Sequence, residues 1–214
     1  MNARVCCRIA LFLFPVYLGA QTTQPVIEGA YFLRGVMEVA SAYRFNADST
    51  FDFYFSYGAI DRYGKGTYDR QGDSLILYSP PKPERDFILE SEKKTDDERV
   101  IIQVKDQNPM VLPYVLCRLL TPQDSILQGQ SDREGYIFFD KTPVKSISLL
   151  HQLWPDRPSV FQVTDPADNF FVFAIDPHII EVDFNGVVLH LAGNALEGPH
   201  PLLEPGKVYR FEKE

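Results

Sequence analysis

Ser49-Thr50-Phe51-Asp52-Phe53-Tyr54-Phe55-Ser56-Tyr57 is the stretch of this 214-residue chain that decides its fold class. Aromatic residues occupy every second position from Phe51 to Tyr57, and Asp52 and Ser56 lie between them. Successive side chains of an extended strand point to opposite faces, so the aromatic residues share one face and the polar residues take the other. The pattern predicts a half-buried β-strand.

Short alternating segments of this kind recur along the whole chain, with turn residues about every eight to twelve positions, a spacing typical of β-sandwiches and barrels. The segment 35–42 fits either a helix or a strand, and the proline-rich segment 80–83 predicts a loop because proline cannot donate to a ladder. Before residue 107 we predict strands at 43–45, 49–57, 66–68, 74–78, 87–89 and 100–104, the last two around a solvated hairpin tip at 92–99. After it we predict strands at 111–119, 135–139, 145–150, 159–163, 170–175, 179–184, 187–191 and 207–211.

Asn185-Gly186 gives the sharpest local prediction in the chain. The pair is the preferred type I′ turn of two-residue hairpin loops, and it separates the apolar segments 179–184 and 187–191. A two-residue loop fixes the register of the two strands, which would place Glu181 directly opposite His190.

The first twenty residues have the order of a secretory signal peptide. Arg4 and Arg8 are basic, 9–17 is almost entirely apolar, and the small pair Gly19-Ala20 precedes a polar run. The apolar run is shorter than the roughly 20 residues that span a bilayer. We therefore expect residues 1–20 to be removed, and the remaining chain to be exported to the periplasm or the cell exterior without a transmembrane segment.

Charge and cysteine content agree with this expectation. The leader holds two of the 21 basic residues and none of the 29 acidic ones, so the chain without it carries a formal net charge of −10. Such a chain repels phosphate backbones, and we expect no nucleic-acid partner. Cys6 and Cys7 leave with the leader, so Cys117 has no partner for an intramolecular disulfide. Its apolar neighbours in 110–116 predict a buried structural thiol rather than a nucleophile.

The segment 131–138, Ser-Asp-Arg-Glu-Gly-Tyr-Ile-Phe, resembles the Thr-Asp-x-x-Gly-x-Phe-x-Phe hairpin of carboxypeptidase regulatory-like modules. These modules are transthyretin-like β-sandwiches of exported bacterial proteins, and the resemblance implies such a sandwich over residues 108–214. The Gly-x-Pro-Leu-x-Gly-Ala element of that family is missing, and 122–129 stands in its place. Asp132 to Gly135 predicts a tight turn in which Gly135 takes a positive φ.

The first half of the chain is similar to small lipocalin-like domains of exported bacterial proteins. Gly29-Ala30-Tyr31 resembles their opening Gly-x-Trp, Asp48-Ser49-Thr50-Phe51 resembles their Asp-Gly-Thr-Phe, and Gly66-Thr67-Tyr68 resembles their Gly-Thr-Trp, with Tyr in place of Trp twice and Ser49 in place of Gly. This resemblance implies a lipocalin-like antiparallel sheet or barrel over residues 21–107, ending at a polar break at 105–109. The expected fold class is therefore all-β, with a lipocalin-like unit followed by a transthyretin-like sandwich.

The chain contains no recognisable catalytic, cofactor or metal motif. Its four histidines lack metal-ligand spacing, and Gly64-Lys65-Gly66 is too short for a phosphate loop. The acidic loop 165–169 offers oxygen ligands for a cation, but it lacks the length and glycine of an EF-hand and matches ordinary turn chemistry. Trp154, the only tryptophan, lies among prolines, where it is either an exposed binding anchor or, as we expect, a cap on one end of the sandwich. We expect no catalytic residue, no cofactor and no metal. The histidines are His151, His178, His190 and His200.

These observations favour an exported, non-catalytic binding or accessory module whose partner is a protein or a glycan. The alternative is a small-molecule carrier with an aromatic-rich pocket in the N-terminal domain, and a hydrolase comes third. A carrier predicts a closed barrel around an apolar cavity, a binding module predicts an exposed aromatic patch, and an enzyme predicts a cleft with perturbed titratable groups.

Overall fold

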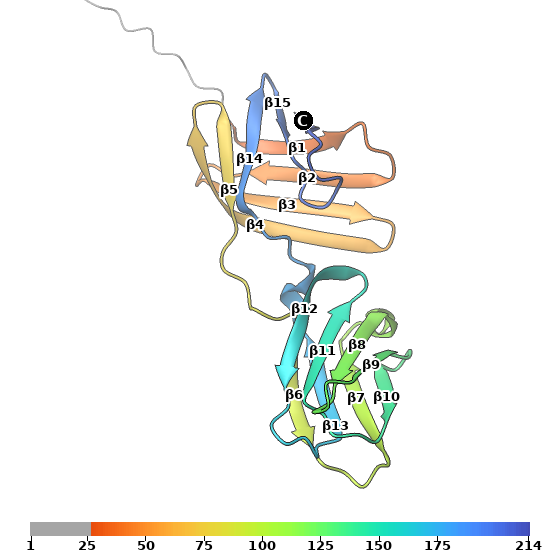
Figure 1. Cartoon of the computed structure of the whole chain (residues 1–214). Helices are drawn as coiled ribbons and strands as arrows, with labels where there is room; N and C mark the ends of the chain where they lie inside the picture. The colour runs from red at the N-terminus through yellow and green to blue at the C-terminus, as the bar shows by residue number, and fades with distance from the viewer. Residues whose placement is uncertain (1–26) are drawn as a thin grey trace, which may run out of the picture.

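A computed structural model describes residues 27–214, and the predicted signal peptide lies outside the described residues. The all-β fold class is confirmed: the chain forms a closed eight-stranded antiparallel barrel and two further four-stranded sheets (Figure 1). Over residues 27–214, none of the helices has both the length and the apolar character needed to cross a bilayer.

The barrel is an up-and-down meander that is interrupted once. Strands β1 to β5 pair in chain order, β14 to β16 continue the meander from β5, and β16 closes it against β1. In pairing order the strands are β1 (Gly29–Arg34), β16 (Tyr209–Lys213), β15 (Ala195–Gly198), β14 (Asn185–Ala192), β5 (Ser74–Tyr78), β4 (Ile60–Gln71), β3 (Thr50–Tyr57) and β2 (Val39–Phe45).

The interruption between β5 and β14 is a β-sandwich (Figure 1). Its two sheets share one apolar core. One sheet has the order β10 (Tyr136–Asp140), β7 (Arg99–Lys105), β13 (Phe170–Ile175) and β6 (Phe87–Lys93). The other has the order β12 (Trp154–Gln162), β11 (Ser146–His151), β8 (Val115–Leu120) and β9 (Ile126–Gln130). Two short 3-10 helices complete the unit, η1 (Pro109–Tyr114) and η2 (Pro177–Ile180).

Sheet pairing differs from the predicted division of the chain into 21–107 and 108–214. Strands β6 and β7 precede residue 108 but pair with β13 of the sandwich, and β14 to β16 follow the sandwich but belong to the barrel. The sandwich is therefore inserted into the barrel rather than attached after it. Each unit has its own hydrophobic core.

Aromatic side chains fill the interior of the barrel. Tyr43 lies at the centre of this packing and is completely buried. The distances between its ring centroid and those of Phe53 and Phe211 are both 4.9 Å. Close packing of this kind leaves the side chains themselves as the contents of the barrel. The other buried aromatic residues of this core are Tyr31, Phe45, Phe51, Phe55, Phe184 and Tyr209.

Several local predictions are confirmed. Phe51, Phe53 and Phe55 are buried on one face of β3, whereas Tyr57 is half exposed at the end of the strand. Gly135 has a φ of +85° in the turn before β10. The ambiguous segment 35–42 is a turn that leads into β2.

The hairpin predicted at Asn185-Gly186 is wrong. Residues 177–180 form η2, and 185–192 is a single strand that pairs with β5 and β15. Gly186 has a φ of +74° at an irregularity in the β5 pairing, but Asn185 does not have the positive φ that a type I′ turn requires. His190 therefore lies opposite Glu197 and Ser74, not opposite Glu181.

The hairpin tip predicted at 92–99 is also wrong, because β6 and β7 are not neighbours. Strand β13 lies between them, antiparallel to β6 and parallel to β7. The side chain of Asn169, at the start of β13, holds the segment in place. It accepts from Thr95 N and donates to the carbonyl oxygens of Asp97 and Arg99.

The interrupted meander predicts which pieces of the chain fold alone. Ser79 and Phe184 face each other across the interruption, with the Ser79 N–H donating to the Phe184 carbonyl at 2.7 Å. Replacing residues 80–183 by a short glycine-rich loop should leave a barrel that unfolds cooperatively in urea, because hairpin loops of two to five residues bridge such a pair. The fragment 21–107 should show no cooperative transition, because it lacks β14 to β16. A folded 21–107 fragment beside an unfolded spliced barrel would contradict this topology.

Candidate functional site at the barrel–sandwich junction

The structure separates the four histidines. His178 and His190 lie near the surface, whereas His151 and His200 are buried in the sandwich and the barrel respectively. His151 Nε2 donates to the carbonyl of Val111 at 3.1 Å, and burial lowers the pKa of its imidazole. In the described part of the chain, no three His, Cys, Asp or Glu side chains gather in a way that could hold a metal ion.

Cys117 is buried in the sandwich core, as predicted, and burial raises the pKa of its thiol to about 12. Such a thiol remains protonated near neutral pH and is a poor nucleophile. In the acidic loop 165–169, Asp165 accepts from Ala167 N, an ordinary turn contact, and the Asn169 side chain is engaged by the neighbouring 95–99 segment.

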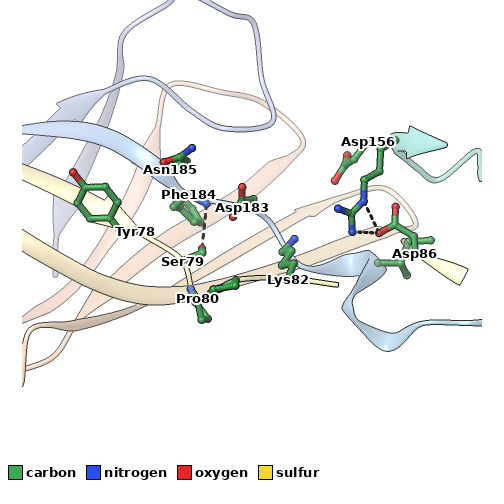
Figure 2. Close-up of a pocket in the computed structure, with 12 residues that line it drawn as sticks. Tyr78, Ser79, Pro80, Lys82, Asp86, Asp156, Asp183, Phe184 and Asn185 are labelled. Atoms are coloured by element: carbon green, nitrogen blue, oxygen red, sulfur yellow. Dashed lines mark hydrogen bonds and ion pairs between the residues drawn. The ribbon is translucent and has the colours of Figure 1, made fainter. Parts of the chain in front are cut away.

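The junction between barrel and sandwich is formed by two chain segments that cross side by side. Residues 79–86 lead into the sandwich and 176–184 lead out of it. They are joined by the Ser79–Phe184 pair, in which the Phe184 N–H also donates to Ser79 Oγ at 3.1 Å. Figure 2 shows this bond in the wall of a pocket of about 520 Å³.

Arg62 connects the two units directly. Its side chain is only 4% exposed, although it belongs to a barrel strand. The guanidinium donates to both carboxylate oxygens of Asp156 on β12, and to the carbonyls of Ile180 at 3.2 Å and Glu181 at 3.1 Å. A bidentate guanidinium–carboxylate pair constrains orientation as well as distance, so it fixes the sandwich against the start of β4.

Two further cations line the junction. Arg157 donates to the buried carboxylate of Asp86 at 2.8 Å, and Lys82 donates to the Glu181 carbonyl. Burial lowers the pKa of Lys82. Both cations are hydrogen-bonded to the two crossing segments and stabilise the junction. We therefore interpret the 520 Å³ pocket as part of the contact between barrel and sandwich rather than as a ligand site.

A second surface lies on the outside of the barrel, beside the junction. We call it the tyrosine face and define it as Asp52, Tyr54, Tyr63, Lys65 and Tyr78. Cross-strand pairing places Tyr54 opposite Tyr63 and Asp52 opposite Lys65. The two tyrosine rings lie 5.8 Å apart between centroids. Tyr54, Tyr63 and Tyr78 are 38%, 47% and 41% exposed.

Polar groups on the tyrosine face are open to a ligand. Lys65 Nζ forms no hydrogen bond or ion pair with any residue of the described chain, even though Asp52 is its cross-strand partner. The nearest polar contact of the Asp52 carboxylate is Asn46 Nδ2 at 3.5 Å. The face therefore presents one unpaired cation and one weakly engaged carboxylate between exposed aromatic rings.

The tyrosine face is hollowed on two sides of Lys65. One pocket, of about 410 Å³, lies between Lys65 and Tyr78. Another, of about 330 Å³, lies between Tyr63 and η2, whose Pro177 and Ile180 form an apolar wall. Main-chain pairing of Val182 N with Tyr63 O, at 2.6 Å, holds that wall against β4.

Sequence reasoning did not identify the tyrosine face. Asp61, Tyr63, Lys65 and Thr67 alternate in the sequence, and all are exposed. The glycines that flank Lys65 suggested a comparison with a phosphate loop, for which the segment is too short. This alternation predicts a strand with one exposed polar and aromatic face. The cross-strand partners of these residues depend on a strand register that the sequence does not specify.

Comparison with known proteins does not assign the chain to a family. The chain matches no family model, no curated protein and no solved structure.

His200 closes one end of the barrel as a neutral group. Leu202 N donates to its Nδ1 at 3.1 Å, so the proton lies on Nε2, which donates to Ser41 Oγ at 3.0 Å. Burial among aromatic rings lowers the pKa of His200 to about 4. This histidine packs against Phe53 and Phe55 in the barrel core.

The low pKa of His200 predicts acid sensitivity. Its unfolded pKa is near 6.5, so the unfolded chain takes up the proton first as pH falls. Stability from this group is complete above about pH 6.5 and is lost as pH falls towards 4, by about 3 kcal/mol in total. Urea unfolding across this range should show a shallower loss for His200→Gln than for the parent chain. His190→Gln, which removes an exposed histidine, is the control, and equal slopes for both variants would contradict the assignment.

Proposed function

We propose that this protein is an exported, non-catalytic binding module that holds a neutral glycan on the tyrosine face. The observation that carries the proposal is the exposed Tyr54–Tyr63 ring pair beside the unpaired Lys65. Export rests on the signal-peptide pattern of residues 1–20. The lipocalin-like and carboxypeptidase regulatory-like character of the two units also belongs to the proposal.

The chemistry of the face suits a sugar. The face of an aromatic ring carries partial negative charge, which attracts the partially positive C–H groups on one side of a pyranose ring. Hydroxyl groups both donate and accept, so they can use the Asp52 carboxylate and the Lys65 ammonium together. Alternation of rings with polar groups distinguishes this surface from the apolar centre of a protein interface. A neutral glycan is favoured because the chain is acidic overall.

The spacing of the face suits an extended ligand. Tyr63 and Thr67 lie four residues apart on β4, which is about 13 Å along a strand. Thr67 pairs with Tyr78, so the Tyr54–Tyr63 pair and the Tyr78 ring mark the two ends of the hollowed surface. An oligosaccharide chain can contact both ends, whereas a single sugar reaches only one.

The two other function classes have less support. A carrier needs an interior cavity, and aromatic residues packed around Tyr43 occupy the barrel interior. A hydrolase needs titratable groups poised in a cleft, yet the junction carboxylates Asp86 and Asp156 are engaged by Arg157 and Arg62. A protein partner remains the competing occupant of the tyrosine face, and the binding experiment distinguishes the two.

Tyr63→Ala should weaken glycan binding by about tenfold, the usual effect of removing one aromatic anchor. Affinity electrophoresis of the parent chain through gels that contain soluble glucans, xylans or mannans identifies the glycan that retards it, and Tyr63→Ala is then measured in that gel. Tyr57→Ala is the matched control, because this tyrosine is equally exposed but lies at the end of β3. Equal retardation of both variants would reject the tyrosine face. Absence of retardation by every polysaccharide would reject the glycan.

A further inference from the structure

A pocket of about 580 Å³ lies on the sandwich side of η2. Trp154, at the start of β12, lines it together with Val111 and the apolar residues of η2. Its rim is polar and comes from the segment after β7, where Gln107 and Asn108 are exposed. An aromatic ring, an aliphatic wall and amide groups at the rim form the usual composition of a small-ligand site.

Trp154 is partly buried against the sandwich core and stacks on His151 at 4.3 Å between ring centroids. It therefore caps the sandwich, as predicted. Its Nε1–H, however, is buried without an acceptor in the described part of the chain. An unpaired buried donor is unfavourable, and a ligand oxygen that accepts from it relieves this cost. The nitrogen is covered in this structure, so a ligand reaches it only when the indole shifts.

Only η2 separates the Trp154 pocket from the tyrosine face. Pro177 and Ile180 line both this pocket and the 330 Å³ pocket beside Tyr63. Helix η2 therefore forms a ridge with a hollow on each side. A chain molecule that lies on the tyrosine face has to cross only this apolar ridge to reach the indole.

We propose that the Trp154 pocket is a second subsite, which takes one sugar unit of the glycan chain held on the tyrosine face. This inference rests on the proposed function. The chemical class is a neutral ring with hydroxyl oxygens, because the rim amides offer donors and the Trp154 Nε1–H becomes a further donor when the indole shifts. Anions are disfavoured because the carboxylates of Glu90, Asp106 and Asp176 line the pocket against one ammonium, that of Lys105, which pairs with Glu90 at 3.3 Å. Binding is consequently length-dependent: short oligosaccharides occupy the tyrosine face alone, and longer ones also enter the Trp154 pocket.

Tryptophan fluorescence tests this assignment, because Trp154 is the only tryptophan in the chain. The full chain is titrated with oligosaccharides of increasing length from the polysaccharide that retards it in gels. Long members should change the emission of Trp154, and short members should bind without changing it. By calorimetry, Trp154→Phe should lower the affinity for long members by about tenfold and leave short members unaffected. Gln107→Ala changes an exposed residue at the rim, and it should lower the affinity for long members less than Trp154→Phe does while leaving short members unaffected.

The possible failures are distinguishable. Long oligosaccharides that bind, are weakened by Tyr63→Ala and yet leave Trp154 emission and the Trp154→Phe affinity unchanged would overturn the second subsite alone. Binding that changes Trp154 emission but is indifferent to Tyr63→Ala would overturn the tyrosine face and the proposal that one glycan chain occupies both sites. Absence of binding by every oligosaccharide would overturn both proposals.

Discussion

A buried guanidinium constrains the whole molecule. Arg62 belongs to barrel strand β4, yet it is withdrawn from solvent, and such a charge is costly unless it is paired and hydrogen-bonded. Its acceptors are Asp156 of the sandwich and the carbonyls of Ile180 and Glu181 at the exit from the sandwich. All of them meet the guanidinium only when the sandwich has one orientation on the barrel. That orientation places η2 beside Tyr63, so the 330 Å³ pocket between them depends on the same interaction.

The aromatic content of the chain is divided between two roles by strand alternation. On β3, Phe51, Phe53 and Phe55 point into the barrel and fill it, whereas Tyr54 points outward and pairs with Tyr63. A filled interior leaves the outer surface and the junction as the places where a ligand can bind. The alternation of side chains along β3 therefore both fills the barrel core and places Tyr54 on the outer surface, where the proposed glycan site lies.

The sequence predicted what depends on neighbouring residues and failed where distant segments meet. The alternation of β3, the turn at Gly135 and the burial of Cys117 are local properties, and all three are confirmed. The Asn185-Gly186 hairpin failed because β5, more than a hundred residues earlier, provides the pairing partner of β14. The predicted domain boundary at 107/108 differs from the observed insertion for the same reason, because pairing between distant strands determines which unit each strand belongs to. Among the residues of the proposed glycan site, the sequence indicated only Trp154 as a candidate binding residue. The residues of the tyrosine face lie on the other side of η2, and no local sequence pattern indicates that they lie near Trp154.

Residual dipolar couplings of the backbone amides test most directly whether barrel and sandwich form one rigid body. Couplings from residues 29–78 and 185–213 define the alignment tensor of the barrel, and those from 87–175 define that of the sandwich. With Arg62 bound to Asp156, the two tensors should agree in magnitude and orientation. They should diverge in Arg62→Met, which removes the guanidinium. Tensors of different magnitude in the parent chain would contradict the fixed junction, and with it the fixed placement of the tyrosine face beside the Trp154 pocket.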